Sequence, residues 1–537
     1  MKIIKKTAWL AMLYIISNFA YAQSFDSLLS DLNAKSFKAK IQAVEKLSEV
    51  SDERVLPTLK SMLDGALYVL KSDGRIVVSK EIDEQFYLHD IVARQDLGAF
   101  EKSEIKKVRI SNKVRRSLRA AIAVLELTSE DRKLRLSSAM NLLKKPDPAL
   151  REMLVLRSEN EKSESVKAII DLVVARIDIA ANDTKLRHEA VMVLASSVEP
   201  EAVGELNKLV EKDDEGNYLE ADTELVELAL KELRTVNSKL GLFQFFENVI
   251  FGMSMGSVLL LAAIGLAITF GVMGVINMAH GEMIMLGAYT TFAIQQMFPS
   301  MIEWSLLFAV PAAFIVSGSV GVLIERTIIR HLYGRPLDTL LATFGVSLIL
   351  QQIVRMYEAN NVPVISPEFM SGFFAINGAL SITYNRIYIF IFSLLVLALL
   401  ALVLKKTLMG LQMRAVTQDR AMATSMGIRS NWVDAMTFGL GSGIAGIAGV
   451  ALSQITNVGP NLGQSYIVDS FMVVVFGGVG NLLGTFFGAM TLGILNKFLE
   501  PYAGAVVGKI LVLIFIILFI QWRPRGLFAL KGRFVDD

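Results

Sequence analysis

The chain has 537 residues, more than one ordinary domain needs, and 53% of them are hydrophobic. Its net charge of only +2, without a long basic stripe, excludes bulk attraction to nucleic acid, and the absence of cysteine excludes disulfides. The sequence up to Lys239 is rich in Lys, Arg, Asp and Glu, whereas it is mostly apolar from Leu242 onward. This break predicts a soluble domain, residues 23–240, followed by a membrane domain, residues 241–537.

The first 22 residues have the pattern of a secretory signal peptide. Three lysines, Lys2, Lys5 and Lys6, precede a short apolar run at 7–16, and residues 20–22 (Ala-Tyr-Ala) form a cleavage site. The alternative is a first transmembrane helix, but the apolar run is too short to cross ~30 Å of hydrocarbon. We therefore expect a cleaved signal that places the soluble domain in the periplasm.

The soluble domain is predicted to be mainly helical. The spacing Ala-x-x-x-Leu recurs, and a second helix follows some copies after a turn, as at 55–63. This resembles HEAT-type helical pairs, in which the small Ala lets helices pack closely, although any helical region produces some such pairs by chance. The pairs with the Ala-x-x-x-Leu spacing are Ala43/Leu47, Ala121/Leu125, Ala139/Leu143 and Ala190/Leu194.

Residues 67–79 predict a β-hairpin with its turn at Asp73-Gly74.

Hydropathy predicts an all-α, polytopic membrane domain. Of its apolar segments, 467–480 and 482–497 are short and joined by glycines, so they form either two crossings or a re-entrant pair. Lysine and arginine gather after the third, fifth and last segments, which indicates a cytoplasmic C-terminus. The segments are 248–273, 280–298, 304–324, 338–354, 387–404, 432–456, 467–480, 482–497 and 505–522.

Two isolated carboxylates stand in this apolar sequence. Glu282 is the only residue among Asp, Glu, Lys and Arg in 248–302, and Asp469 is the only one in 435–496. A charge inside a membrane is costly, so each residue is a candidate for the cargo pathway. The alternative is that each faces water, Glu282 from a cytoplasmic turn and Asp469 from the periplasmic start of a span.

Two glycine-rich segments, 270–277 and 476–481, each end in an asparagine. Transporters interrupt helices near the bilayer midplane, where helix ends and amide groups meet the cargo. The pattern therefore predicts pathway roles for the two asparagines, and close helix packing is the alternative. The glycines of 439–449 are assigned to packing. The candidate pathway residues are Asn277, Glu282, Gln454, Asn457, Asp469 and Asn481.

Residues 410–429 form a polar segment with a helical pattern that is predicted to lie in the cytoplasm. A short amphipathic helix between spans can dock into a groove on a partner and transmit the partner's motion to the spans. The alternative is an ordinary loop helix on the membrane surface. The candidate contact residues are Arg414, Ala415, Asp419, Ala421 and Gly427.

Residues 265–289, GLAITFGVMGVINMAHGEMIMLGAY, resemble the signature of permeases in the branched-chain amino acid class of ABC importers, and 410–429 resembles their coupling loop. Within that class, residues 458–485 and 500–533 are similar to the urea permease subunits, which also carry a signal sequence and an N-terminal extension. The resemblance implies a urea importer in the bacterial inner membrane. Its partners would be a second permease of the same class, two cytoplasmic ATPases and a periplasmic urea-binding protein.

The sequence contains no P-loop pattern G-x-x-x-x-G-K-[ST], so ATP would be bound by the partners, and we expect no cofactor or metal in this chain. The absence of Lys and Arg from 248–302 and 435–496 favours neutral urea, because an amino acid needs a cation or a helix N-terminus for its carboxylate. The alternatives are branched-chain amino acids or short amides in the same class, and a stand-alone passive urea channel. No residue pattern supports an enzyme.

Overall fold

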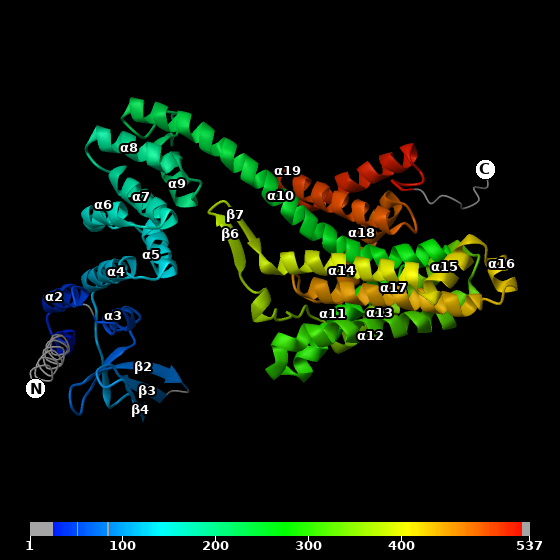
Figure 1. Cartoon of the computed structure of the whole chain (residues 1–537), viewed down its shortest axis with the longest axis horizontal. Coiled ribbons are helices and arrows are strands. Elements are labelled where there is room, and N and C mark those ends of the chain that lie inside the picture. The colour runs from blue at the N-terminus through cyan, green and yellow to red at the C-terminus, as the bar shows by residue number, and fades with distance from the viewer. Residues whose placement is uncertain (1–24, 51, 83–84, 529–537) are drawn as a thin grey trace, which may run out of the picture. The chain divides into compact units, whose positions relative to one another are not determined.

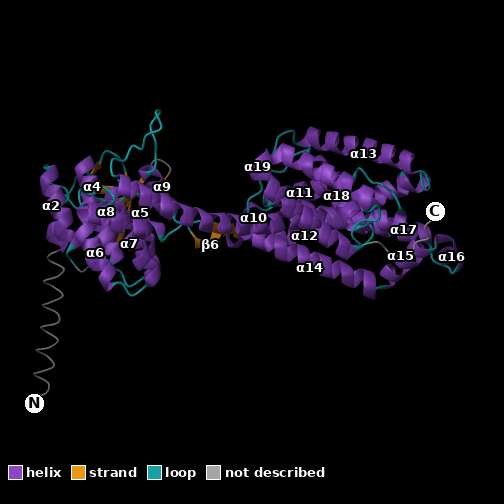
Figure 2. Ribbon diagram, turned by 90° about the horizontal axis from the view of Figure 1, so that it is seen from above, coloured by secondary structure: helices purple, strands orange, loops and turns teal. Residues whose placement is uncertain are grey.

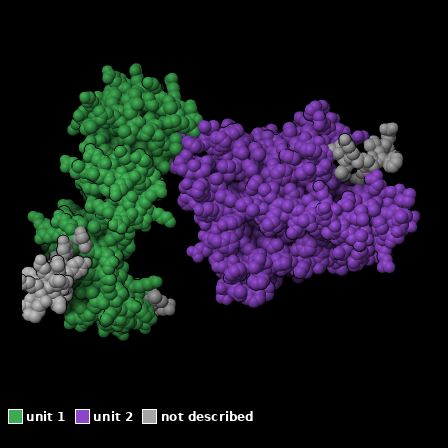
Figure 3. Space-filling model, in the orientation of Figure 1, with its two compact units in different colours: residues 1–239 green, residues 240–537 purple. Residues whose placement is uncertain are grey.

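The computed structural model describes residues 25–50, 52–82 and 85–528, so the predicted signal peptide lies outside the described residues. The chain forms two compact units that divide between Lys239 and Leu240 (Figure 3). Helices dominate both units, and the strands are few (Figure 2). The predicted fold class, a helical polytopic permease preceded by a mainly helical domain with a small β element, is confirmed.

The β element of the first unit is larger than the predicted hairpin. It is an antiparallel sheet with the strand order β4-β3-β2-β1-β5. The predicted hairpin is β1 and β2, which pair Leu67 with Val78 across the expected turn. The other strands were missed, although β3 alternates exposed and buried residues, which is the period of a strand. The strands are β1 (Leu67–Leu70), β2 (Ile76–Ile82), β3 (Gln85–Asp90), β4 (Gln95–Phe100) and β5 (Ile105–Lys107).

The helices of the first unit pack against helices one or two places along the chain, such as α5 against α7 and α7 against α8 (Figure 1). The predicted second helix at 55–63 is α3 with the same bounds. Ala139, Leu143, Ala190 and Leu194 are all buried between helices, as the recurring pattern indicated. The helices are α2 (Phe37–Ser48), α3 (Val55–Leu63), α4 (Asn112–Leu127), α5 (Arg132–Lys144), η1 (Pro148–Leu150), α6 (Arg151–Asn160), α7 (Glu164–Asp178), α8 (Thr184–Ala195) and α9 (Pro200–Leu209).

The second unit is a bundle of long apolar helices. Among the described residues, six helical segments are long and apolar enough to cross a membrane, and α18 is a shorter apolar helix. Helix α10 (Thr223–Met273) begins in the first unit and continues into the second. The other helices are α11 (His280–Met297), η2 (Pro299–Trp304), α12 (Ser305–Thr327), η3 (Ile329–His331), α13 (Pro336–Tyr357), η4 (Glu368–Met370), α14 (Tyr384–Lys406), α15 (Leu408–Gln418), α16 (Arg420–Ser425), α17 (Ser430–Ser453), α18 (Leu462–Gly477) and α19 (Leu482–Trp522). A hairpin of β6 (Phe373–Asn377) and β7 (Leu380–Thr383) precedes α14.

Close packing of α17 against α11 and α12 forms the centre of this bundle. A Cβ atom at Gly446 would lie 2.5 Å from the carbonyl oxygen of Ala313, and one at Gly449 would lie 2.0 Å from that of Ile284, so a side chain at either position would clash with the backbone of a neighbouring helix. The assignment of the glycines of 439–449 to helix packing is therefore confirmed.

The last apolar segments form a helical hairpin with an added arm. Gly477 of α18 contacts Gly484 of α19, so these two helices run antiparallel. At Gly504 the backbone has φ 75° and ψ 165°, a conformation that glycine adopts readily, and α19 breaks there. The arm that follows runs parallel to α18, because Phe519 packs on Phe476 with ring centroids 4.6 Å apart and Lys509 meets Asp469.

Candidate functional site

The connection between α10 and α11 turns back along α10. The Nε2 atom of His280 donates a hydrogen bond to the carbonyl of Ala262 at 2.8 Å. Ala262 lies 11 residues before Met273, the end of α10 (273 − 262), which corresponds to about 16 Å along a helix. Helix α11 therefore begins beside the middle of the apolar part of α10, residues 248–273. Glu282 lies in the first turn of α11 and is 1% exposed, so the alternative that it faces water from a turn is not what the structure shows.

Glu282 is held by one polar face of α13. Its Oε1 atom accepts hydrogen bonds from Ser347 at 2.9 Å and from Gln351 at 2.7 Å. Thr343, one turn earlier on the same face, accepts a hydrogen bond from the backbone N–H of Met278 at 3.1 Å. Sequence reasoning missed this face, although a polar residue at every fourth position of an apolar helix was a usable signal.

Three buried polar atoms around the start of α11 lack a hydrogen-bond partner among the described residues. They are Nδ2 of Asn277, Nδ1 of His280 and Oε2 of Glu282. The Asn277 and His280 side chains are fully buried, and the Oδ1 atom of Asn277 accepts from the N–H of Ala279 at 3.0 Å. Buried polar groups are rarely left unpaired, so this cluster has the capacity to bind a further polar group.

Two helix N-termini meet next to Glu282. Helix α11 begins at His280 and α18 begins at Leu462. A Cβ atom at Gly281 would lie 2.5 Å from the carbonyl oxygen of Gly463, so the two helix starts are in direct contact. A helix N-terminus carries a partial positive charge from its free N–H groups. The region therefore combines a carboxylate with two helix N-termini. Although 248–302 and 435–496 contain no Lys or Arg, the Arg355 guanidinium of α13 donates to Oδ1 of Asn461, the residue before α18, at 2.6 Å.

Asp469 and Asn481 have partners of their own. Asp469 is buried and forms an ion pair with Lys509 at 2.8 Å. Lys509 lies 40 residues later in the chain (509 − 469), and no local sequence pattern links the two residues. The Oδ1 atom of Asn481 accepts from the N–H of Gly484 at 3.1 Å and so caps α19. Both residues thus have structural contacts, and whether either one meets the cargo stays a prediction.

The two remaining pathway candidates, Gln454 and Asn457, directly follow the C-terminal end of α17. Gln454 is buried, donates to Ser453 at 3.1 Å and keeps an unpaired Oε1 atom, whereas Asn457 is exposed. In the part of the chain that the structure describes, no group of three or more His, Asp or Glu side chains could hold a metal ion.

The polar segment 410–429 is two helices and not one. Asp419 has an extended backbone, φ −151° and ψ 108°, and its side chain accepts from the N–H of Met422 at 2.9 Å, which ends α15 and starts α16. Arg414 donates to the carbonyl of Leu404, and Gly427 follows α16 with φ +90°, the usual conformation of a glycine after a helix. The Ala421 side chain is exposed, whereas Ala415 is partly buried.

An ion pair that sequence reasoning missed ties α16 to the bundle. The Arg420 guanidinium binds the carboxylate of Asp434, which lies in the first turns of α17 and is 3% exposed. The same guanidinium stacks 4.0 Å from the ring centroid of Tyr333, in the connection between α12 and α13. Arg420 therefore connects α16 to two separate parts of the membrane unit.

Residues 248–520 match the family model described as branched-chain amino acid transport system / permease component. The chain is 30% identical over 296 residues to the high-affinity branched-chain amino acid transport system permease protein BraD of Pseudomonas aeruginosa, covering 53% of this chain and 96% of that protein. It is also 30% identical to the corresponding permease protein LivH of Salmonella typhimurium, covering 53% and 95%, and 22% identical to LivM of the same organism, covering 51% and 68%. No solved structure gives a significant match.

Proposed function

The chain belongs to the branched-chain amino acid transport system permease family, and from this premise we propose that it is one permease subunit of an ATP-driven importer in the bacterial inner membrane. The relatives are membrane permease components, not enzymes. Similarity to both LivH and LivM of one organism supports pairing with a second permease of the same class. Two cytoplasmic ATPases and a cargo-binding protein complete the proposed assembly, with the first unit in the periplasm and ATP bound by the ATPases.

The cargo we propose is a branched-chain amino acid, which revises the expectation of urea. The observation that carries this choice is the buried Glu282, whose Oε2 atom is unpaired in the described structure. A carboxylate can bind the α-ammonium group of an amino acid, and the adjoining starts of α11 and α18 suit its carboxylate. The relatives named for branched-chain amino acids support the same choice.

Urea stays the second candidate, on a specific observation. The groups that surround Glu282 are the neutral donors Ser347 and Gln351, and 248–302 and 435–496 contain no Lys or Arg. Urea carries four N–H donors and one acceptor oxygen, so an unpaired carboxylate oxygen with amide neighbours also matches its chemistry.

The variant Glu282→Gln separates the two cargoes. The change keeps the side-chain shape and one acceptor oxygen but removes the negative charge. If an ammonium group pairs with Glu282, uptake of labelled leucine into proteoliposomes that hold the whole importer falls roughly 10- to 100-fold, the value of a hydrogen bond to a charged group. If the cargo is urea, wild-type vesicles take up labelled urea but not leucine, and the variant retains most of that uptake.

The matched control is Gln296→Glu, which exchanges an amide for a carboxylate on the same helix. Gln296 is exposed and lies 14 residues after Glu282 (296 − 282), so uptake by this variant stays at the wild-type level. Energy-dependent uptake of neither leucine nor urea by the wild-type importer would refute the proposed cargo classes, and uptake that is independent of ATP would refute the importer itself.

A further inference from the structure

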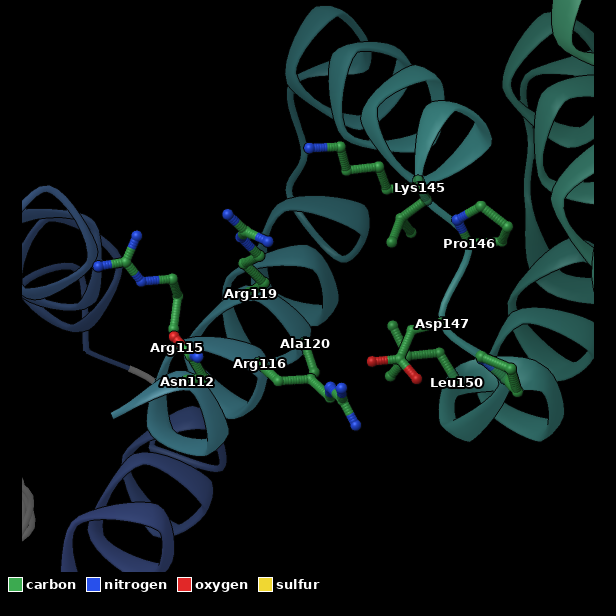
Figure 4. A pocket seen from close by; sticks show the side chains of 11 residues that line it. Asn112, Arg115, Arg116, Arg119, Ala120, Lys145, Pro146, Asp147 and Leu150 are labelled. Atoms are coloured by element: carbon green, nitrogen blue, oxygen red, sulfur yellow. The ribbon is translucent and has the colours of Figure 1, made fainter. Parts of the chain in front are cut away.

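The first unit contains a basic cleft between α4 and the end of α5 (Figure 4). We call it the α4–α5 cleft; its volume is about 610 Å³. Arg115, Arg116 and Arg119 line it from α4, and Lys145 and Asp147 line it from the connection after α5. Leu142 is buried on its apolar side. In Figure 4, the Lys145 side chain extends from the end of α5 toward the side on which Arg119 projects.

The cations lie on one face of α4 because of the helical repeat. Arg119 follows Arg115 by four residues and Arg116 by three, so the three side chains share one side of the helix, whereas Val114 and Leu118 lie on another side and are fully buried in the core. Burial of the apolar face fixes the basic face toward the cleft. The three arginines and Lys145 are all exposed, so their charges are available to a ligand.

These four cations have no carboxylate partner in the described residues, which distinguishes them from other arginines of the same unit. Within the cleft the one acid is Asp147, and its Oδ1 atom accepts from the N–H of Ala149 at 3.1 Å, which caps η1. Elsewhere in the unit, arginines form ion pairs with Asp or Glu: Arg54, Arg75, Arg135, Arg151, Arg157, Arg176 and Arg187. The cleft is therefore a place where four cations without an ion pair lie together.

The size and exposure of the α4–α5 cleft determine what can bind there. Because its cations are exposed, water and salt screen each one, and a single small anion gains little. A ligand with several carboxylates along its length contacts several cations at once. The arginines span 119 − 115 residues, or about 6 Å of helix, and Lys145 faces them from a second element. A flat bilayer surface cannot contact both walls of a concave cleft.

We propose that the α4–α5 cleft binds an acidic segment of a protein partner. Carboxylates of the segment pair with Arg116, Arg119 and Lys145, and apolar side chains of the segment pack on Leu142 and Ala120. Arginine suits such an interface because its planar guanidinium binds a carboxylate through two parallel hydrogen bonds. This inference is independent of the cargo, since it concerns only residues of the first unit, which lie before the matched region 248–520.

The test measures binding of a fluorescent peptide of alternating Glu and Leu to the full chain in detergent, by fluorescence anisotropy. In the double variant Arg116→Glu/Arg119→Glu, two attractive exposed pairs are replaced by two repulsive ones. Each of the two lost attractions and each of the two added repulsions is worth a factor of about two to three, and these four factors together lower the affinity on the order of 30-fold. Because the side chains are exposed, the variant keeps its fold, which circular dichroism checks. Arg116→Lys/Arg119→Lys keeps most of the affinity.

The matched control is Lys133→Glu/Lys185→Glu, which reverses two exposed charges of the same unit outside the cleft. Unchanged affinity in this control and salt-sensitive binding in the wild type support the proposal. Equal losses in both double variants, or no binding by the wild type, overturn it. Phosphate or vesicles of anionic lipid that compete as effectively as the peptide also overturn it, in favour of a small anion or a membrane surface.

Discussion

The ion pair between Arg420 and Asp434 permits a demanding test of how α16 is held. Asp434 is buried, and in the described structure Arg420 is the residue that forms an ion pair with it. The substitution Arg420→Gln leaves that carboxylate inside the protein without a positive partner. Asp434→Asn removes the other half of the pair with little change of shape.

The expected loss of unfolding free energy follows from how deeply the ion pair is buried. Removal of one partner from a fully buried pair costs about 3–5 kcal/mol of unfolding free energy. The Arg420 side chain is 32% exposed, so water offsets part of this, and we expect a loss of about 2 kcal/mol for Arg420→Gln. The double variant Arg420→Gln/Asp434→Asn regains part of the loss, which gives a coupling energy of about 1 kcal/mol.

The assay is a double-mutant cycle on denaturant unfolding of the full chain in detergent. The control is Arg414→Gln, because Arg414 binds a backbone carbonyl, that of Leu404, and no carboxylate. In the reconstituted importer with Arg420→Gln we also expect ATP hydrolysis to continue while cargo uptake per ATP falls several-fold, because α16 is no longer joined to α17 by the ion pair. Strictly additive losses in the cycle, together with unchanged uptake per ATP, would refute the reasoning.

Two further predictions concern other buried carboxylates. Lys509→Met removes the ion-pair partner of Asp469, and we expect a loss of about 1–3 kcal/mol in the free energy of unfolding. Adding Asp469→Asn should restore most of that loss, and a double variant no more stable than Lys509→Met would contradict the prediction. Burial by itself raises the pKa of Glu161, but hydrogen bonds from Arg135 and the N–H of Ser163, with the charge of Arg157, hold that pKa below its usual 4.5. A lowered folded-state pKa stabilises the protein above pH 4.5, and this stabilisation is lost as pH falls further. We therefore expect the protection factors of α6 amides in hydrogen exchange, which correct for the intrinsic pH dependence, to fall below pH 4.5 in the wild type and to be lower at neutral pH in Glu161→Gln. A pH-independent difference between the two proteins would be inconsistent with this reasoning.

The contacts around Glu282 and Asp469 show why the sequence could nominate these residues but not describe them. Each was found as a lone charge in an apolar segment, which is a local property. Ser347 and Gln351 lie 65 and 69 residues after Glu282, and Lys509 lies 40 residues after Asp469. Such distant partners depend on how whole helices pack.

The cargo expectation changed for a related reason. The absence of lysine and arginine from the candidate pathway favoured neutral urea, because the sequence shows side-chain charges but not where helices start in space. The adjoining starts of α11 and α18 add positive potential that no single residue carries. The relatives then favour an amino acid, and the uptake experiment with Glu282→Gln decides between the two.

By itself the sequence determined the helical membrane fold, the apolar segments, the helix at 55–63 and the hairpin around Asp73-Gly74. These features follow from hydropathy, helical repeat and turn residues, all of which act over a few neighbouring positions. Only the tertiary structure decided that α11 starts beside Ala262, that Arg420 binds Asp434 and that four cations share one cleft. Those contacts join segments far apart in the chain, and packing of the complete elements selects them.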